Sequence, residues 1–245
     1  TDCLNFGNPE RPEIMGQLAA AVKGLSLACR ALETPVVSGN VSLYNETDGE
    51  SILPTPTVGM VGLLEDVARA VPHAFRAEHD VVALLGETRD ELGRSATVLG
   101  RDEGPCPLLD LLAVRSMVDL LVDLAADGLL SSAHDVSDGG LAVALAEAAM
   151  PNGLGADLNV ETALLPAIYL FSQSAPRVVV SFPPGRERAV LEAARRHGVP
   201  TAFLGRVSRG SLRVAVSGNV VLDVPVSTLT KASEEAFGKM MEVTE

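Results

Sequence analysis

The sequence predicts an α+β protein made of two parts, and three observations support that class. Short apolar segments of strand character alternate with longer segments in which apolar residues recur at helical spacing. Turn clusters rich in Gly, Pro, Asn and Ser separate these segments. Apolar residues make up 47% of the chain, enough for a packed core, which Leu, Val and Ala must fill because aromatic residues make up only 3%.

The length and the charge restrict the kinds of partner. At 245 residues, the chain has room for one large or two modest domains. A formal net charge of -13 argues against a nucleic-acid partner, whose affinity would come largely from Lys and Arg. A nucleotide is compatible with this charge, because it needs only a local positive or metal-bearing pocket.

The cysteines and the hydropathy pattern indicate a cytoplasmic protein. Cys3, Cys29 and Cys106 are odd in number and form no CxxC pair, which is typical of reduced thiols and not of a disulfide framework or a zinc site. Apolar runs end well before the ~18 residues that a membrane span needs, and no signal peptide opens the chain, so we expect no membrane partner.

The first part, residues 1–78, is expected to be an incomplete domain of a longer protein, because the chain opens without Met on what reads as the end of a strand. Residues 13–32 show the apolar spacing of a helix, which Thr34-Pro35 ends because a residue before proline avoids the α region. Residues 72–80 are polar and form the expected linker. The other expected elements are a strand end at 1–6, a glycine-interrupted strand at 35–43 and a strand at 57–64.

The second part, residues 79–245, is expected to be a complete α+β domain. Its clearest helix covers residues 108–127, where Gly128 follows an apolar stripe. Another helix, residues 185–197, has a basic end that suits the helix dipole, and Ser217-Gly218-Asn219 predicts a hairpin turn. The remaining expected elements are strands at 81–85, 131–136, 156–160, 177–182, 201–207, 212–216 and 220–224, helices at 141–150, 166–170 and 225–245, and some helical character at 90–99.

Ser38-Gly39-Asn40 interrupts the strand at 35–43 and carries the first candidate site. Glycine lets another group approach the backbone closely. Asn40 offers a carbonyl oxygen that suits a hard cation, and Ser42 offers a hydroxyl two residues later. Positions 40 and 42 face the same side of an extended backbone, so one strand presents both groups to one pocket. The alternative is an ordinary strand with a glycine bulge and a polar edge.

The segment His134–Gly140 joins an expected strand to an expected helix. Asp138 can cap that helix, and Gly139 and Gly140 let a phosphate or another chain approach the N–H groups at its start. The alternative is simply a well-capped helix after a tight turn. His134 is a candidate general base, but a single histidine without a visible partner is more often structural.

Other polar residues are weaker candidates. Asp2 is either a ligand or a solvated carboxylate at the end of a strand. Asn5 and Asn8 flank Gly7 and share the pocket of Asp2, or they belong to an ordinary turn. Gln173-Ser174 stands in an apolar neighbourhood and is expected at the surface. The sequence contains no Walker-type phosphate loop, no G-x-S-x-G and no H-E-x-x-H, so any ATP site works without a P-loop.

Four ordered segments closely resemble the second half of phosphoribosylformylglycinamidine synthase, the large synthetase component of purine synthesis. They are TDCLNFGNPERPEI, TPVVSGNVSLYNET, ILPTPTVG and AHDVSDGGLAVALAE. The segments are long and follow the order of the family, and the likeness covers the whole chain. The resemblance implies a PurM-like fold, shared with aminoimidazole ribonucleotide synthetase. It consists here of a partial N-terminal-type domain with barrel-forming strands and helices, followed by a C-terminal-type α/β sandwich domain.

The resemblance also implies an ATP-dependent ligase that forms a C–N bond. The family converts formylglycinamide ribonucleotide, ATP and ammonia from glutamine to formylglycinamidine ribonucleotide, ADP and phosphate, with Mg²⁺ at the transferring phosphoryl group. The implied partners are the missing N-terminal half of the polypeptide, a glutaminase subunit and a small accessory subunit. Because the family's catalytic side chains belong to the other half, we expect no catalytic residue in this fragment and no activity from it alone.

Residue by residue, the family's pattern assigns roles to the interrupted strand and its neighbour. Asp2 and Gly39 would contact ATP. Asn40 would ligate Mg²⁺, and Ser42 would contact the substrate. The candidates for an auxiliary, structural nucleotide site, implied by pseudo-symmetry, are Asp135, Asp138, Gly139 and Gly140. Gln173-Ser174-Ala175 departs from the Glu-Ser-Gln of the first half, which suggests that this second site is degenerate.

Two other functions stay open at this point. The chain is a non-catalytic assembly module whose nucleotide pocket only stabilises the fold, or it belongs to a related ATP-dependent kinase of the same superfamily. The lack of the kinases' aspartate-rich N-terminal metal run weighs against the kinase, although truncation can hide that run. Replacing Asn40 with Ala separates the synthetase from the assembly module, since unchanged turnover favours the module.

Overall fold

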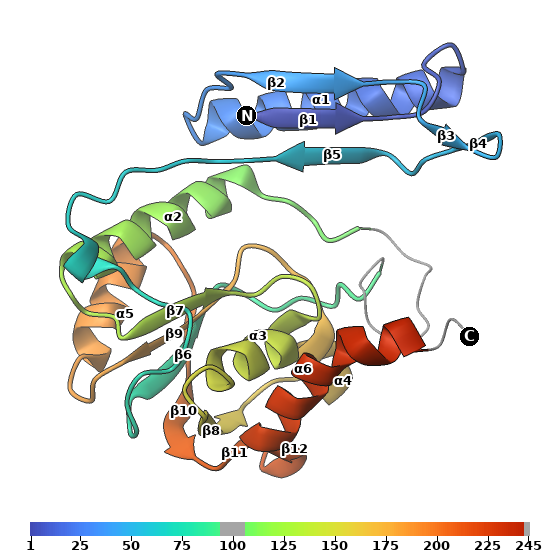
Figure 1. Ribbon diagram of the computed structural model, residues 1–245. Coiled ribbons are helices and arrows are strands. Elements are labelled where there is room, and N and C mark those ends of the chain that lie inside the picture. Colours follow the sequence, from blue (N-terminus) through green and yellow to red (C-terminus); the bar gives the residue numbers. More distant parts are fainter. Residues whose placement is uncertain (94–105, 243–245) are drawn as a thin grey trace. The chain divides into compact units, whose positions relative to one another are not determined.

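The computed structural model describes residues 1–93 and 106–242, and the chain folds into two compact units (Figure 1). The first unit comprises Thr1–Glu65 and the second Asp66–Glu245. The division falls before residues 72–80, where the sequence predicted a linker. Phe75 of that stretch is fully buried in the core of the second unit, and its N–H donates to the carbonyl of Ala148 at 2.8 Å. The linker prediction is wrong because the polar average of the stretch hides this large apolar side chain.

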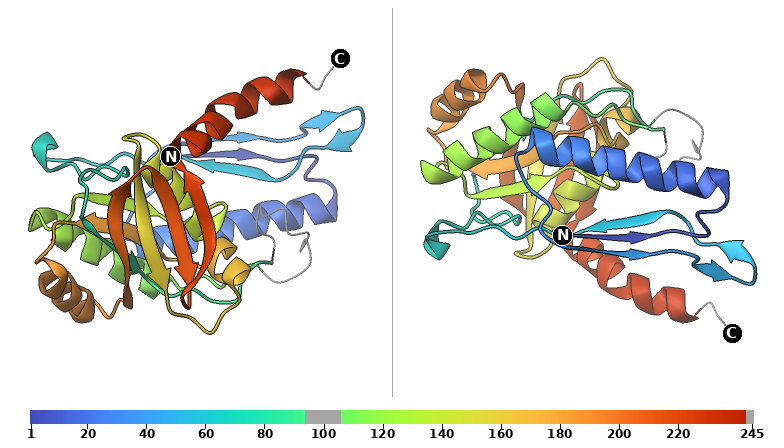
Figure 2. Two further views of the ribbon diagram at one scale, coloured as in Figure 1. Left: turned by 90° about the horizontal axis from the view of Figure 1, so that it is seen from below. Right: turned by 90° about the horizontal axis from the view of Figure 1, so that it is seen from above.

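The first unit is a three-stranded sheet with one helix. Its central strand, β1 (Asp2–Asn5), pairs in parallel with β2 (Gly39–Ser42) and antiparallel with β5 (Thr55–Val58). A parallel pair needs a crossover connection, which α1 (Pro12–Ala31) provides. The helix lies along one face of the sheet (Figure 2). A small hairpin of β3 (Glu46–Thr47) and β4 (Glu50–Ser51) lies between β2 and β5 in the chain.

A small apolar core holds the helix of the first unit to its sheet. Leu4 and Phe6 from the β1 segment are buried against Ile14 of α1. Half-buried side chains that pack around this centre are Leu18, Ala21, Leu25 and Leu43. The helix begins and ends within one residue of the range 13–32, so the prediction from apolar spacing is confirmed.

Two strands of the first unit are shorter than the sequence predicted. Residues 35–37 are not in a strand, and Val37 is 83% exposed. The strand expected at 57–64 covers only Thr55–Val58, and Val61 beyond it is 99% exposed. Both flanking strands pair residue for residue with β1, which is four residues long. The length of the central strand therefore limits its neighbours, whatever their own β-propensity.

Strands and helices alternate along the second unit. Their bounds are η1, a 3₁₀ helix (Val67–Arg69), β6 (Val81–Leu85), α2 (Leu111–Ala126), β7 (Ser132–Asp135), α3 (Gly140–Ala149), β8 (Leu154–Val160), α4 (Pro166–Phe171), β9 (Val178–Phe182), α5 (Glu187–Arg196), β10 (Thr201–Arg209), β11 (Ser211–Val216), β12 (Asn219–Pro225) and α6 (Val226–Glu242). The strands form one mixed sheet with the order β12-β11-β8-β10-β6-β9-β7. Helices α3, α4 and α6 pack on one face, and α2 and α5 pack together on the other (Figures 1 and 2).

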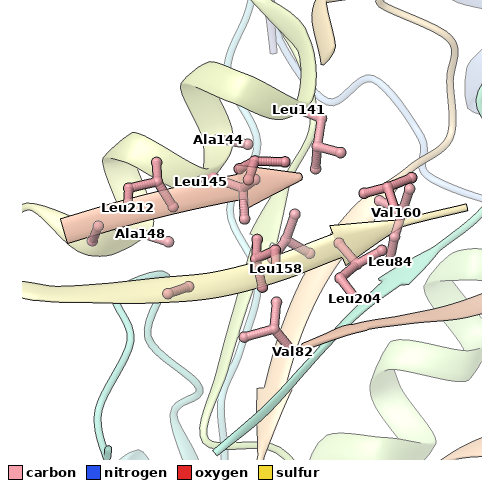
Figure 3. Packing of buried hydrophobic residues seen from close by; sticks show 14 of the residues in the cluster. Val82, Leu84, Leu141, Ala144, Leu145, Ala148, Leu158, Val160, Leu204 and Leu212 are labelled. Atoms are coloured by element: carbon pink, nitrogen blue, oxygen red, sulfur yellow. The ribbon is translucent and has the colours of Figure 1, made fainter. Parts of the chain in front are cut away.

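β6 contributes to both apolar cores of the second unit, because all of its side chains are buried. Val82 and Leu84 point into the core under α3, whereas Val81, Ala83 and Leu85 point into the core under α2 and α5. Figure 3 shows the first of these cores, in which Val82 and Leu84 lie among side chains of α3, β8, β10 and β11. A strand covered on both faces reads as a continuous apolar run, as VVALL does.

Most of the elements predicted for the second unit are confirmed. The hairpin between β11 and β12 turns at Ser217 and Gly218, whose φ angles are both positive (49° and 79°), as a two-residue hairpin turn requires. Residues 90–93 are not helical, and the rest of the helical stretch expected at 90–99 lies outside the described residues. No helix within residues 1–93 and 106–242 is both long and apolar enough to cross a bilayer.

Asp80, directly before β6, is a buried carboxyl whose Oδ2 has no hydrogen-bond partner among the described residues. Burial raises the pKa of Asp80 above its ordinary 3.8, and a hydrogen bond from the Ser131 side chain offsets part of that rise. The folded protein therefore holds this proton more tightly than the unfolded chain does. It follows that the contribution of Asp80 to the free energy of unfolding falls as the pH rises through this raised pKa.

We expect Asp80→Asn to increase the free energy of unfolding at pH 7 by about 1 kcal/mol, because it removes a buried charge with an unpaired oxygen. The gain should shrink as the pH falls through the raised pKa of Asp80, because the carboxyl group is then itself protonated. Urea unfolding at pH 7 and over a series of lower pH values measures the difference. Asp223→Asn, at an exposed position of β12, is the matched control and should change nothing. A loss of stability at pH 7 in Asp80→Asn would contradict the argument.

Candidate functional site

The register of β1 against β2 brings the candidate residues of the first unit together. Partners in register point to the same face of a sheet, because side chains alternate along each strand. Two segments that are distant in the sequence thus form one small surface at this pair of strands. The residues in register are Asp2 with Gly39, Cys3 with Asn40, and Asn5 with Ser42.

Asp2 and Gly39 make the closest approach in this surface. A Cβ atom built on Gly39 would lie 2.2 Å from Asp2 Oδ1 and 3.2 Å from Asp2 Cγ. The Asp2 carboxylate thus lies directly over the Gly39 backbone and would have to move to admit any side chain at position 39. Leu4 follows two residues after Asp2 on the same face and packs against α1. The Asp2–Gly39 pair therefore belongs to the helix-covered face of the sheet.

Asn40 and Ser42 lie on the opposite face, on one side of β2. This arrangement confirms the prediction that one strand presents both groups to the same side. Cys3 and Asn5 of β1 share that face. Asn5 thus points away from the Asp2 carboxylate, so the prediction that the two share a pocket is wrong because they are three residues apart on a strand.

Asn8, the other candidate near Gly7, has an ordinary turn role. Its Oδ1 accepts a hydrogen bond from the Glu10 N–H at 2.8 Å. This bond is the Asx pattern that was the alternative for the Asn-Gly-Asn sequence.

The Asn40 side chain is exposed and presents its amide in one orientation. Its Nδ2 donates to Cys3 Sγ at 3.6 Å, and its Oδ1 accepts no hydrogen bond from the residues that the structure describes. An amide oxygen is a hard donor that suits Mg²⁺, which keeps most of its waters and takes few protein ligands when phosphates complete its shell. Nowhere in residues 1–93 and 106–242 do three or more His, Cys, Asp or Glu gather as a metal site. Asn40 therefore fits a partial ligand set and not a closed metal cage.

Asn45 fixes the hydroxyl of Ser42, and the sequence analysis did not single it out. Its Nδ2 donates to the carbonyls of Phe6 and Ser42, at 3.1 and 2.9 Å, and lies 3.1 Å from Ser42 Oγ. Ser42 Oγ in turn donates to Asn45 Oδ1 at 3.2 Å. The hydroxyl is thus held in place and keeps acceptor capacity for a ligand. Only the folded turn after β2 reveals this role of Asn45, because in the sequence Asn45 looks like an ordinary turn residue.

The segment around Asp135 forms a tight turn into α3. The prediction that Asp138 caps this helix is wrong: Gly139 is the N-cap residue, with a φ of 78°, and no side chain caps the helix there. Gly140 is needed for packing, since a Cβ on it would lie 2.7 Å from the Ser172 carbonyl oxygen and 2.8 Å from that of Leu170. Its N–H donates to the Ser137 carbonyl at 3.0 Å. The Asp135 side chain is 76% exposed.

His134 has a set of contacts that explains its position. Its Nδ1 lies 2.7 Å from the Asp135 carbonyl oxygen, and its Nε2 lies 3.4 Å from Glu147 Oε2 of α3. The ring of His73 meets it edge to face, with a centroid distance of 5.5 Å. These contacts match the structural alternative for this histidine.

Ser174 is fully buried, so the expectation that Gln173-Ser174 lies at the surface is wrong for the serine. Its Oγ accepts from the Arg89 N–H at 3.0 Å and donates to the Arg89 carbonyl at 3.3 Å. Polar residues are buried without penalty where the backbone of another segment satisfies them. The burial of Ser174 therefore depends on the 86–91 segment, which no local pattern shows.

Arg177 organises the same region and also escaped the sequence analysis. Its guanidinium is buried and donates to the carbonyls of Ser172 and Ser174 and to Thr88 Oγ1, the last two at 2.8 and 3.0 Å. Burial lowers the pKa of Arg177 to about 10, and nearby Tyr169 opposes that shift. The group stays charged at neutral pH. Its hydrogen bonds connect the start of β9 to Thr88, which follows β6, and to Ser172 and Ser174, which follow α4.

Comparisons with known proteins agree with this architecture. A family model described as AIR synthase related protein, N-terminal domain, matches residues 1–64, and one described as AIR synthase related protein, C-terminal domain, matches residues 77–217. Phosphoribosylformylglycinamidine synthase subunit PurL of Moorella thermoacetica is 43% identical over 244 residues, which cover 98% of this chain and 33% of the relative. The chain thus spans about a third of the length of the curated relatives it matches.

Two solved structures share the fold. Thermotoga maritima PurL complexed with FGAR superposes with a TM-score of 0.73 at 19% identity, covering 94% of this chain and 39% of that one. The same protein complexed with ATP gives a TM-score of 0.70 at 18% identity, covering 94% and 37%. These similarities confirm the PurM-like α+β fold that the sequence predicted. Because the two family models together match most of the chain, it belongs to the AIR synthase related protein family and carries segments of both its N-terminal and C-terminal domains.

Proposed function

We propose that this chain is part of a synthetase that converts formylglycinamide ribonucleotide, ATP and ammonia to formylglycinamidine ribonucleotide, ADP and phosphate. The observation that carries the proposal is the register of β1 and β2, which places Asp2 over Gly39 and sets Asn40 and Ser42 side by side on one face. The relatives named PurL, and the PurL structures with ATP and with FGAR, support the choice of this reaction.

The chemistry of each side chain suits a different part of the reactants. An ionised Asp2 only accepts hydrogen bonds, so it suits hydroxyl and amino donors of the nucleoside and not its phosphates. The absence of a side chain at Gly39 makes room for the Asp2 carboxylate, so the two residues would contact the nucleotide together. The Asn40 amide oxygen would hold Mg²⁺, which neutralises charge on the phosphoryl group during transfer. The Ser42 hydroxyl, held by Asn45, orients the ribonucleotide substrate.

In the proposed reaction, the formylglycinamide oxygen attacks the γ-phosphorus of ATP and the bond to ADP breaks. Ammonia then adds to the carbon of the iminophosphate, and phosphate leaves with the former amide oxygen. Asn40, Ser42 and Asp2 position the reactants for these steps, and positioning supplies much of the barrier reduction in phosphoryl transfer. We propose that the proton-transferring groups come from the other half of the polypeptide, so that this chain alone does not turn over.

The proposed enzyme acts in the cytoplasm, in purine synthesis, and receives ammonia from a glutaminase subunit with the help of a small accessory subunit. An assembly named PurLQS among the structural neighbours supports such partners. We further propose that exposed Asp135 and Asp138 belong to an auxiliary nucleotide site of structural role. Gly139 and Gly140 would shape the turn of that site, and the Gly140 N–H, which already donates to Ser137, would not serve as a phosphate ligand.

Replacing Asn40 with Ala in the complete synthetase tests the proposal. We expect the Mg²⁺ concentration needed for half-maximal ATP-dependent turnover to rise at least about tenfold, because the loss of even an outer-shell partner of a metal ligand typically costs about 10–100-fold in affinity. The Km for formylglycinamide ribonucleotide should stay unchanged. Steady-state kinetics over a Mg²⁺ series at fixed ATP measures both quantities.

Asn219→Ala is the matched control, because Asn219 is an exposed asparagine at the β11–β12 turn and should leave both quantities unchanged. Unchanged Mg²⁺ dependence in Asn40→Ala would favour the alternative that this chain is an assembly module. Production of a phosphorylated substrate without incorporation of ammonia would favour the related kinase.

A further inference from the structure

Cys3 lies at the centre of a small polar cluster on the face that carries Asn40. The Asn40 Nδ2 donates to Cys3 Sγ at 3.6 Å, and the Asn5 Nδ2 lies 3.4 Å from the same sulfur. Cys3 Sγ is also 3.8 Å from Asn5 Oδ1, which can accept the thiol hydrogen. The thiol is half-buried between two asparagines, and none of the roles proposed above uses it.

Two backbone carbonyls determine which groups donate and which accept in this cluster. Asn5 Nδ2 donates to the carbonyls of Cys3 and Thr55, at 3.3 and 3.2 Å, and carbonyls only accept. This fixes the side of Asn5 that carries its amide nitrogen, and leaves its Oδ1 to accept from the Cys3 thiol. The Cys3 sulfur, whose hydrogen is directed to Asn5, then presents lone pairs to Asn40.

We propose that Cys3 is a positioning residue for the metal ligand of the synthetase site. An asparagine amide has two orientations of similar shape, which differ by exchanging Oδ1 and Nδ2. Only the orientation with Oδ1 outward ligates a cation, because an amide nitrogen presents hydrogens. By accepting from Nδ2, Cys3 selects the orientation of Asn40 whose oxygen is directed away from the sheet. This inference rests on the proposed function, in which Asn40 holds Mg²⁺.

The expected size of the effect follows from the strength of one intramolecular hydrogen bond, which sets an upper range because sulfur is a weak acceptor. A net contribution of a single intramolecular hydrogen bond corresponds to about a threefold to tenfold change in an equilibrium constant. Removing the thiol should therefore weaken metal binding by about that factor, without removing the metal ligand itself. ATP binding in the absence of metal should not change, since Asp2 and Gly39 lie on the other face.

The test measures metal affinity directly, with Mn²⁺ as the probe and electron paramagnetic resonance as the readout, on the complete synthetase with ATP present. We expect Cys3→Ala to weaken Mn²⁺ binding about threefold to tenfold. Cys3→Ser, which keeps a hydroxyl that accepts a hydrogen bond, should recover part of the loss. The Km for formylglycinamide ribonucleotide should not change in either variant. Cys29→Ala, which removes a half-buried thiol from α1 of the same unit, is the matched control and should behave as the parent protein.

The outcomes separate this inference from the proposed function. Asn40→Ala is measured in the same way, and an unchanged Mn²⁺ affinity in that variant would overturn the proposed function. A weakened affinity in Asn40→Ala with parental affinity in both Cys3 variants would overturn only the role of Cys3. An equal loss in Cys3→Ala and Cys29→Ala would mean a general loss of structure, and it would also count against positioning. If Cys3→Ala does not fold, Cys3→Val, which fills the space of the thiol but accepts no hydrogen bond, takes its place, and parental Mn²⁺ affinity in that variant overturns the role of Cys3.

Discussion

Replacing Gly39 with Ala is expected to reduce kcat/KM for ATP about 100-fold in the complete synthetase. The added methyl carbon would lie 2.2 Å from Asp2 Oδ1 and 3.4 Å from the Asp2 carbonyl oxygen. The Asp2 carboxylate must move to relieve this clash, because the paired backbones of β1 and β2 cannot separate without losing their hydrogen bonds. The Asp2 side chain is short, so any such movement displaces the whole carboxyl group. Misplacing a substrate-positioning group by about 1 Å can cost about 100-fold in rate.

Gly16→Ala is the matched control for this substitution. Gly16 lies in α1 of the same unit, and a Cβ built on it meets no atom within 4 Å. It should leave kcat/KM unchanged and stabilise the helix by up to about 1 kcal/mol. Steady-state kinetics at saturating ribonucleotide measures both variants.

A double-mutant cycle shows whether the effect passes through Asp2. If the clash with the carboxylate is the cause, Gly39→Ala should add little to a protein that already carries Asp2→Ala. Full additivity of the two substitutions would contradict the argument. It would indicate that Gly39 acts on the nucleotide by itself.

The sequence predicted those elements whose boundaries are set by their own residues. The helix expected at 13–32 is α1 (Pro12–Ala31), and the one expected at 108–127 is α2 (Leu111–Ala126). Apolar spacing marks the buried face of each helix, and Pro35 and Gly128 mark where it cannot continue. The strand at 81–85 was also predicted correctly, because five consecutive apolar residues fit a strand buried on both faces.

The misses in strand length, helix capping and serine burial share one physical cause, which is that the missing information belongs to a partner segment. The strands predicted at 35–37 and beyond Val58 have apolar residues but no paired neighbour. Asp138 has a good capping side chain, yet Gly139 takes the N-cap position, because the chain must turn there and Gly140 must approach the end of α4. Ser174 is buried because the backbone of Arg89 satisfies it.

The candidate site likewise contains residues that the sequence could place and residues that only the structure places. The alternation of a strand was enough to place Asn40 and Ser42 on one side. The positions of Cys3 and Asn45 depend on a parallel register and on a turn, and neither can be read from one strand. The resemblance to a family assigned roles to single residues, but it did not identify the neighbouring side chains that fix the positions of those residues.

Replacing Arg177 with Met is expected to lower the free energy of unfolding by about 3–5 kcal/mol, the largest stability change we predict. Methionine fills much of the volume but donates no hydrogen bond, so the carbonyls of Ser172 and Ser174 lose their guanidinium partner inside the core. Each buried polar group left without a partner costs about 1–3 kcal/mol. The gain from removing a buried charge is smaller than usual, because the charge is already compensated by the bonds that the substitution removes.

Arg177→Lys distinguishes the charge from its geometry. A lysine keeps the positive charge but donates from one point, and it cannot reach Thr88 and both carbonyls in the planar arrangement of a guanidinium. If geometry matters, the lysine variant should lose a large part of the same free energy. If only the charge matters, it should be as stable as the parent. Urea unfolding at pH 7 decides between them, and at that pH Arg177 is charged because its lowered pKa is still about 10.

Arg188→Met provides the control, since the Arg188 side chain in α5 is 89% exposed and the same chemical change there removes only a surface pair with Glu192. It should leave the unfolding midpoint unchanged. Equal losses for the two methionine variants would show that the buried network contributes nothing specific. A selective loss at Arg177, together with disturbed protection of the amides of Arg89 and Glu91, would show that one buried guanidinium holds the segments at 86–91 and 172–177 in place.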